Sequence, residues 1–106
     1  MEKKALITSV FALSEVAGFF SRKVSPKIAS SVVDEIKNFK RLGVIYFEGS
    51  HTFQDSLLST CIATGLSAAD AIHYLQALSH PDIDELVTLD RDFKKVEHSI
   101  KVTVLE

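Results

Sequence analysis

The chain has 106 residues, enough for one hydrophobic core and too few for two, so we expect a single domain over residues 1–106. Apolar residues make up 46% and charged residues 25%, as in ordinary globular proteins, and the net charge of −2 provides no global attraction to nucleic acid or to an anionic membrane. Cys61 is the only cysteine, which excludes an internal disulfide and is typical of a reducing, cytoplasmic setting. The early apolar run is interrupted by Glu15, which argues against a secretory signal and a membrane span.

Strand and helix patterns alternate along the chain. In chain order we predict a strand over 5–10, a helix over 11–21, a helix from Ser25 to Phe39 with Gly43 as its stop signal, a strand over 44–47, a helix over 50–64, a helix from Ser67 to the residue before Pro81, a strand over 85–89, a turn or short helix over 90–96 and a strand over 101–105. Ser9 and Ser25 are expected to cap the first two helices, and Gly65 to end the third. The alternation predicts the α/β class with a mainly parallel sheet.

Three acidic residues follow strands or open helices. Glu15 lies in the helix after the first strand, Asp70 in the first turn of the helix opened by Ser67, and Asp90 directly after the strand over 85–89. Because the carboxyl ends of parallel strands share one edge of a sheet, we expect these carboxylates to gather there. Helix starts favour the ionised form of Glu15 and Asp70. Gathered carboxylates repel one another unless a cation neutralises them, which favours a Mg²⁺ or Mn²⁺ site.

Each acid also has a structural interpretation. Ser67 and Asp70 resemble a capping box, Asp90 is suited to start a turn with Asp92 capping the short helix behind it, and Glu15 faces solvent if its helix is covered on one side only. If the carboxylates lie far apart, the chain is a plain small α/β domain whose acids are caps.

Three stretches in order, TSVFALSEVAGFF, GLSAADAIHYLQAL and ELVTLDRDFKKV, resemble the PIN-domain family, with the ribonuclease toxins of VapBC-type toxin–antitoxin systems as the closest likeness. The resemblance implies a PIN-like three-layer α/β fold and a Mg²⁺- or Mn²⁺-dependent ribonuclease that cuts RNA by metal-activated water attack. Its implied catalytic residues and metal ligands are Glu15, Asp70 and Asp90, with Asp92 as a further ligand. Thr88, beside the last acid, and the cations Arg91 and Lys94, placed to hold RNA phosphates, are the implied substrate-binding residues.

One departure from the family concerns the start of the chain. PIN domains begin with a strand that ends in Asp and forms the middle of the sheet, followed by a helix, and nothing before Ala5 corresponds to them. We therefore expect an N-terminally truncated domain with impaired activity. The strands over 5–10 and 85–89 should pair directly or leave open edges, which favours a homodimer. An antitoxin protein is an implied partner, and a non-catalytic PIN-like binding and dimerisation module is the alternative function.

The side chains outside these motifs receive simpler predictions. Phe19, Phe20 and Phe39 are expected in the core or on a dimer face, and basic pairs such as Arg22 and Lys23 on the solvated surface.

Overall fold

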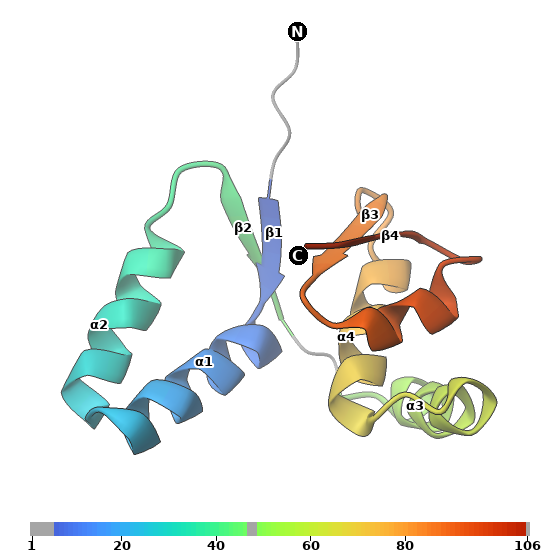
Figure 1. Ribbon diagram of the computed structural model, residues 1–106, viewed down its shortest axis with the longest axis horizontal. Coiled ribbons are helices and arrows are strands. Elements are labelled where there is room, and N and C mark those ends of the chain that lie inside the picture. Colours follow the sequence, from blue (N-terminus) through green and yellow to red (C-terminus); the bar gives the residue numbers. More distant parts are fainter. Residues whose placement is uncertain (1–5, 47–48, 106) are drawn as a thin grey trace, which may run out of the picture. The chain divides into compact units, whose positions relative to one another are not determined.

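The computed structural model describes residues 6–46 and 49–105 (Figure 1). The chain divides into two compact units, Met1–Phe47 and Glu48–Glu106. Each contains helices and one pair of parallel strands, which confirms the predicted α/β class with parallel strands. Among the described residues, β1 pairs with β2 in one two-stranded sheet and β3 pairs with β4 in another, so within its own unit each strand lies at an edge. No helix in the described ranges is both long and apolar enough to cross a bilayer.

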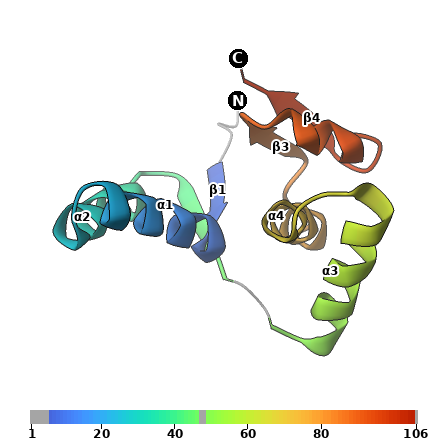
Figure 2. The same cartoon turned by 60° about the horizontal axis from the view of Figure 1, so that its bottom comes forward.

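The first unit is built from two strands and a helical hairpin. Its elements are β1 (Leu6–Ser9), α1 (Val10–Lys23), α2 (Pro26–Lys37) and β2 (Leu42–Ile45). Leu6 lies opposite Leu42 in the parallel β1–β2 pair. The helix α1 packs against α2, and the two lie side by side in both ribbon views (Figures 1 and 2). The Ser9 hydroxyl accepts a hydrogen bond from the Ala12 N–H at 2.9 Å, and the Ser25 hydroxyl accepts one from the Ile28 N–H at 3.2 Å. Both predicted N-caps are therefore confirmed.

The end of α2 differs from the prediction. The helix stops at Lys37, with Asn38 as its C-cap, so Phe39 lies beyond the helix. Its side chain is 61% exposed, which excludes the core, while its place on a dimer face stays a prediction. Arg41, with a φ of 65°, turns the chain into β2, and Gly43, predicted as the stop signal, lies inside that strand. A cap and a turn built from ordinary residues thus end this helix in place of the glycine. Ala5 and Phe47, which the predicted strands included, lie outside the described residues.

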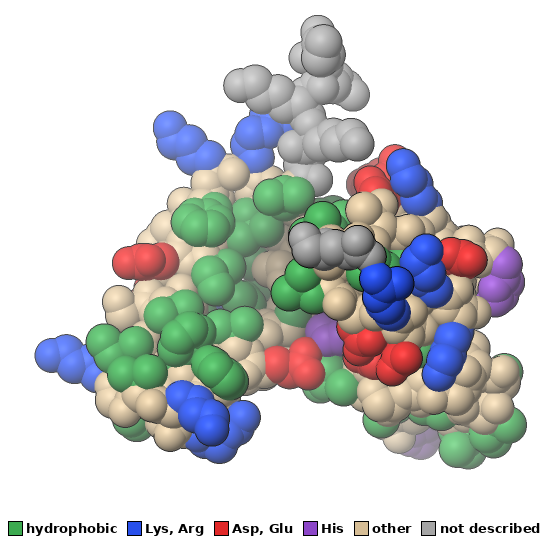
Figure 3. All heavy atoms as spheres, in the orientation of Figure 1, with side chains coloured by type: hydrophobic (Ala, Val, Ile, Leu, Met, Phe, Trp, Pro, Cys, Tyr) green, Lys and Arg blue, Asp and Glu red, His purple; other side chains and the backbone are tan. Residues whose placement is uncertain are grey.

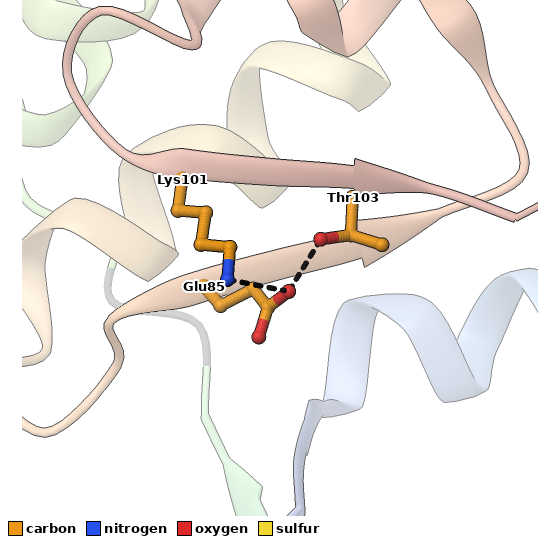
Figure 4. A network of polar contacts seen from close by, with 3 residues as sticks. All are labelled: Glu85, Lys101 and Thr103. Carbon is orange, nitrogen blue, oxygen red and sulfur yellow. Dashed lines mark hydrogen bonds and ion pairs between the residues drawn. The ribbon is translucent and has the colours of Figure 1, made fainter.

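The second unit carries the remaining elements. They are α3 (His51–Thr64), α4 (Ala68–Ser79), β3 (Glu85–Thr88), the short 3₁₀ helix η1 (Arg91–Val96) and β4 (Lys101–Val104). Gly65 ends α3 in the left-handed conformation, with a φ of 73°, as predicted. The two strands are parallel, with Glu85 opposite Lys101. The Thr103 hydroxyl donates a hydrogen bond to the Glu85 carboxylate, and the Lys101 ammonium lies 3.9 Å from the same oxygen (Figure 4). These cross-strand contacts favour the observed register.

One hydrophobic cluster holds the second unit together. Its buried members are Leu66, Ala71, Tyr74, Ala77, Phe93, Val96 and Ile100. Ala71 on α4 and Val96 on η1 are completely buried, so the cluster packs the start of α4 against η1. This packing fixes the acidic residues at the two helix starts relative to each other. In the first unit, by contrast, the buried apolar side chains among the described residues are those of Leu13 and Ala29.

Candidate metal centre

Three carboxylates of the second unit meet at the starts of α4 and η1. Asp70 is the third residue of α4, Asp90 precedes η1, and Asp92 is its second residue. One oxygen from each lies within 4.8 Å of an oxygen from each of the others. Asp70 is half-buried, whereas Asp90 and Asp92 are exposed. The structure thus brings together three of the four predicted acidic ligands from positions twenty residues apart in the chain.

Local capping and core packing position Asp70. The Ser67 hydroxyl is the N-cap of α4 and accepts a hydrogen bond from the Asp70 N–H at 3.2 Å. Leu66 before the cap and Ala71 after Asp70 are both buried in the core. The carboxylate is therefore carried by a helix turn that is anchored on both sides.

Two consecutive side-chain-to-backbone hydrogen bonds position Asp90 and Asp92. The Thr88 hydroxyl accepts from the Asp90 N–H at 3.0 Å, and the Asp90 Oδ1 accepts from the Asp92 N–H at 2.8 Å. The cap of the short helix is therefore Asp90, and the interpretation that assigned the cap to Asp92 was wrong. The Thr88 carbonyl in turn accepts from the Leu105 N–H at 2.8 Å, which ties this turn to the end of β4.

Burial raises the pKa of Asp70 above its ordinary value of 3.8, and the negative charge of Asp90 raises it further. The hydrogen bond with the Ser67 side chain and the charge of His73 act in the opposite direction, and Asp92 adds a smaller upward shift. We had expected the helix start to favour the ionised form of Asp70, but burial and the neighbouring carboxylates outweigh it. A bound cation would instead lower the pKa of Asp70, because it stabilises the ionised carboxylate.

The donor set fits a hard divalent cation. All three side chains offer carboxylate oxygens, which Mg²⁺ and Mn²⁺ prefer over nitrogen or sulfur ligands. Their spacing, together with the raised pKa of Asp70, indicates a negative potential that such an ion would neutralise.

The remaining predicted site residues all lie within the described part of the chain; they are Glu15, Thr88, Arg91 and Lys94. Glu15 is exposed on α1 as its sixth residue, beyond the first turn, where the helix dipole no longer stabilises its charge. It belongs to the first unit, and its role as a ligand stays a prediction. Arg91 and Lys94 are exposed on η1 in the segment that holds Asp92, and their contact with substrate also stays a prediction.

The sequence analysis placed Thr88 beside substrate and missed the hydrogen bond that its hydroxyl accepts from the Asp90 N–H. A Thr two residues before the start of a turn is a recognisable signal for such a bond.

Comparison with known proteins gives one result at the family level. The model of the PIN domain family matches residues 1–99, a range that includes Glu15, Asp70, Asp90 and Asp92. No curated protein and no solved structure matches the chain. Because the match spans nearly the whole sequence, the chain belongs to the PIN domain family, a nuclease-type family.

Proposed function

We propose that this protein is a metal-dependent endoribonuclease that cleaves phosphodiester bonds in RNA. The observation that carries the proposal is the approach of the Asp70, Asp90 and Asp92 carboxylates to within 4.8 Å of one another on two separate elements. Family membership supports it, since PIN domains are typically dependent on divalent metals and act on RNA.

Asp70, Asp90 and Asp92 would hold Mg²⁺ or Mn²⁺, with Glu15 as a further ligand. When bound, the ion would supply Lewis-acid activation of water and charge neutralisation at the scissile phosphate. Asp90 uses Oδ1 to hold the turn, and its position there orients the carboxylate toward the other two acids. The exposed Arg91 and Lys94 would bind the phosphates on either side of the cleaved bond.

The biological setting that we propose is that of a VapBC-type toxin. The protein would act in the cytoplasm as a single-domain homodimer, and an antitoxin protein would hold it inactive. PIN nucleases often pair with antitoxins, which supports this setting.

A second candidate function is a non-catalytic PIN-like module for binding and dimerisation. The open strand edges favour it: over the described ranges each strand has a hydrogen-bonded neighbour on one side only. Such edges readily accept a strand from another chain.

Cleavage of a fluorescently labelled single-stranded RNA in Mg²⁺ or Mn²⁺ tests the nuclease proposal. Asp70→Asn and Asp92→Asn should each lower the cleavage rate by about 100-fold or more, since they remove ligands from the metal. Asp55→Asn, which neutralises an exposed acid on α3, is the matched control and should leave the rate unchanged. Cleavage that persists in EDTA, or that survives Asp70→Asn, would refute the proposal. Calorimetry that finds no binding of Mg²⁺ or Mn²⁺, together with dimerisation in sedimentation, would support the binding module instead.

A further inference from the structure

The turn between α1 and α2 exposes apolar and basic side chains together. We call this surface the α1–α2 tip. Its members are Phe19, Arg22, Lys23, Val24, Lys27 and Ile28. The side chains of Phe19, Val24 and Ile28 are 49%, 60% and 43% exposed. In the space-filling view, hydrophobic side chains cover much of the visible face of this unit, and Lys and Arg side chains gather at its lower end, where Figure 1 shows the turn (Figure 3).

The charge of the tip is of one sign. Arg22, Lys23 and Lys27 are the only charged residues between Glu15 and Asp34, which gives the segment over 16–33 a net charge of +3 from three cations and no acid. Arg22 and Lys23 lie in the last turn of α1, where the helix dipole favours cations. Lys27 lies in the first turn of α2, where the dipole disfavours them. The helix dipole therefore accounts for the positions of Arg22 and Lys23 and does not account for that of Lys27.

Two contacts limit the freedom of the tip. The Phe19 and Phe20 rings meet edge to face, with their centroids 5.3 Å apart. A Cβ built on Gly18 would meet the Arg22 Nη1 at 3.0 Å, so the guanidinium lies close over the α1 backbone. Aromatic and arginine side chains are enriched at protein interfaces, and this turn exposes one of each in Phe19 and Arg22.

We propose that the α1–α2 tip is a docking site for a segment of a partner protein that carries apolar and acidic side chains. The apolar residues of the segment would cover Phe19, Val24 and Ile28, and its carboxylates would face the three cations. The proposal is independent of the nuclease function, since it uses no residue of the candidate metal centre.

Three other occupants fit the tip less well. RNA bases stack on aromatic rings, and Phe19 is the single aromatic member of the tip, whereas Val24 and Ile28 are aliphatic and offer no stacking face. An anionic membrane attracts each surface cation by only about 1 kcal/mol, so three of them hold a protein weakly. A symmetric contact with the same tip of a second copy would bring six cations together with no acid between them.

The test uses the full chain and a fluorescein-labelled synthetic helical peptide of about 16 residues, with leucines at helical spacing and glutamates between them. Fluorescence anisotropy should show binding that weakens with salt. The double variant Lys23→Glu/Lys27→Glu should bind at least about ten-fold more weakly. Lys37→Glu/Lys40→Glu, the same charge change on exposed residues of the same unit, should bind within about two-fold of the unchanged chain. Val24→Ser/Ile28→Ser should also weaken binding, whereas Leu58→Ser on α3, which removes an exposed leucine elsewhere, should not.

Several results would overturn the proposal. One is that a peptide with lysine in place of every glutamate binds as tightly as the glutamate peptide. Another is that Lys37→Glu/Lys40→Glu weakens peptide binding as much as Lys23→Glu/Lys27→Glu does. A third is that the peptide does not bind, while oligouridylate RNA, phosphatidylserine vesicles or a second copy of the chain does bind and loses that binding in Lys23→Glu/Lys27→Glu. If circular dichroism shows that a tip variant is unfolded, carbodiimide cross-linking of the peptide to the unchanged chain decides: cross-links at Lys23 or Lys27 support the proposal, and cross-links elsewhere alone refute it.

Discussion

Asp70→Asn should change the stability of the protein in opposite directions with and without metal. The substitution keeps the size of the side chain and an oxygen that accepts hydrogen bonds, and it removes the charge of the half-buried member of the acidic cluster. In EDTA we expect the variant to be more stable than the unchanged protein. In Mn²⁺ we expect it to be less stable. The reversal follows because the same carboxylate is repelled by its neighbours and attracted by the cation.

The expected gain in EDTA follows from the spacing of the carboxylates. Two unit charges 4.8 Å apart repel by about 0.9 kcal/mol in a dielectric of about 80, and Asp70 faces both Asp90 and Asp92. The water-like dielectric is appropriate because these two neighbours are exposed. Salt screens part of the repulsion, so we expect a net gain of about 1 kcal/mol in the free energy of unfolding. In Mn²⁺ at about 100 times its dissociation constant, the unchanged protein should gain about 2.7 kcal/mol. The Asp70→Asn variant should gain little of this stabilisation by Mn²⁺.

Urea unfolding followed by circular dichroism, in EDTA and in Mn²⁺, measures both effects. Asp55→Asn on α3 is the control, since it removes an exposed charge outside the cluster and should leave both midpoints in place. The reasoning fails if Asp70→Asn lowers stability in EDTA, or if Mn²⁺ stabilises the variant as much as it stabilises the unchanged protein.

Three further predictions concern the supports of the site. Ser67→Ala should lower the free energy of unfolding by about 1 kcal/mol, since it removes the N-cap that accepts the Asp70 N–H, and a urea midpoint that does not move would contradict this role. Gly65→Ala should cost about 1 kcal/mol in the same assay because of the left-handed φ of 73° alone: the nearest atom to the added Cβ, the Lys95 Nζ at 3.9 Å, makes an ordinary contact. The raised pKa of Asp70 means that the folded state holds its proton more tightly than the unfolded chain. In metal-free buffer the contribution of the Asp70 carboxyl to stability is therefore present below pH 3.8 and lost as the pH rises through the higher folded pKa. The affinity for Mn²⁺, measured by calorimetry, should begin to fall on acidification at a higher pH than it would with an ordinary Asp as ligand.

Features set by neighbouring residues were predictable from the sequence. The N-caps Ser9 and Ser25 and the C-terminal Gly65 depend on short side-chain or backbone geometry, and all three are confirmed. The end of α2 depends on Asn38 and on the turn at Arg41, whose residue types are less diagnostic than a glycine. Strand pairing depends on contacts between distant segments, which periodicity does not specify. The division into the β1–β2 and β3–β4 pairs therefore came from the structure alone.

The candidate site shows the same division between local and distant causes. The rule that strand ends and helix starts share an edge was enough to expect Asp70 beside Asp90. The direction of the pKa shift of Asp70 was not predictable, because it depends on how deeply the start of α4 is buried. Glu15 appeared to be buried because its neighbours in sequence are apolar. The structure exposes it, as a helix with one covered face allows.

The hydrogen bond from the Leu105 N–H to the Thr88 carbonyl has a practical consequence for work with this protein. The Thr88 hydroxyl also accepts from the Asp90 N–H, so the Leu105 backbone supports, through Thr88, a carboxylate fifteen positions earlier. A truncation that removes Leu105 would take away that support while leaving Asp70, Asp90 and Asp92 in place. Variants shortened past Leu105 are therefore unsuitable for measuring metal binding by these three acids.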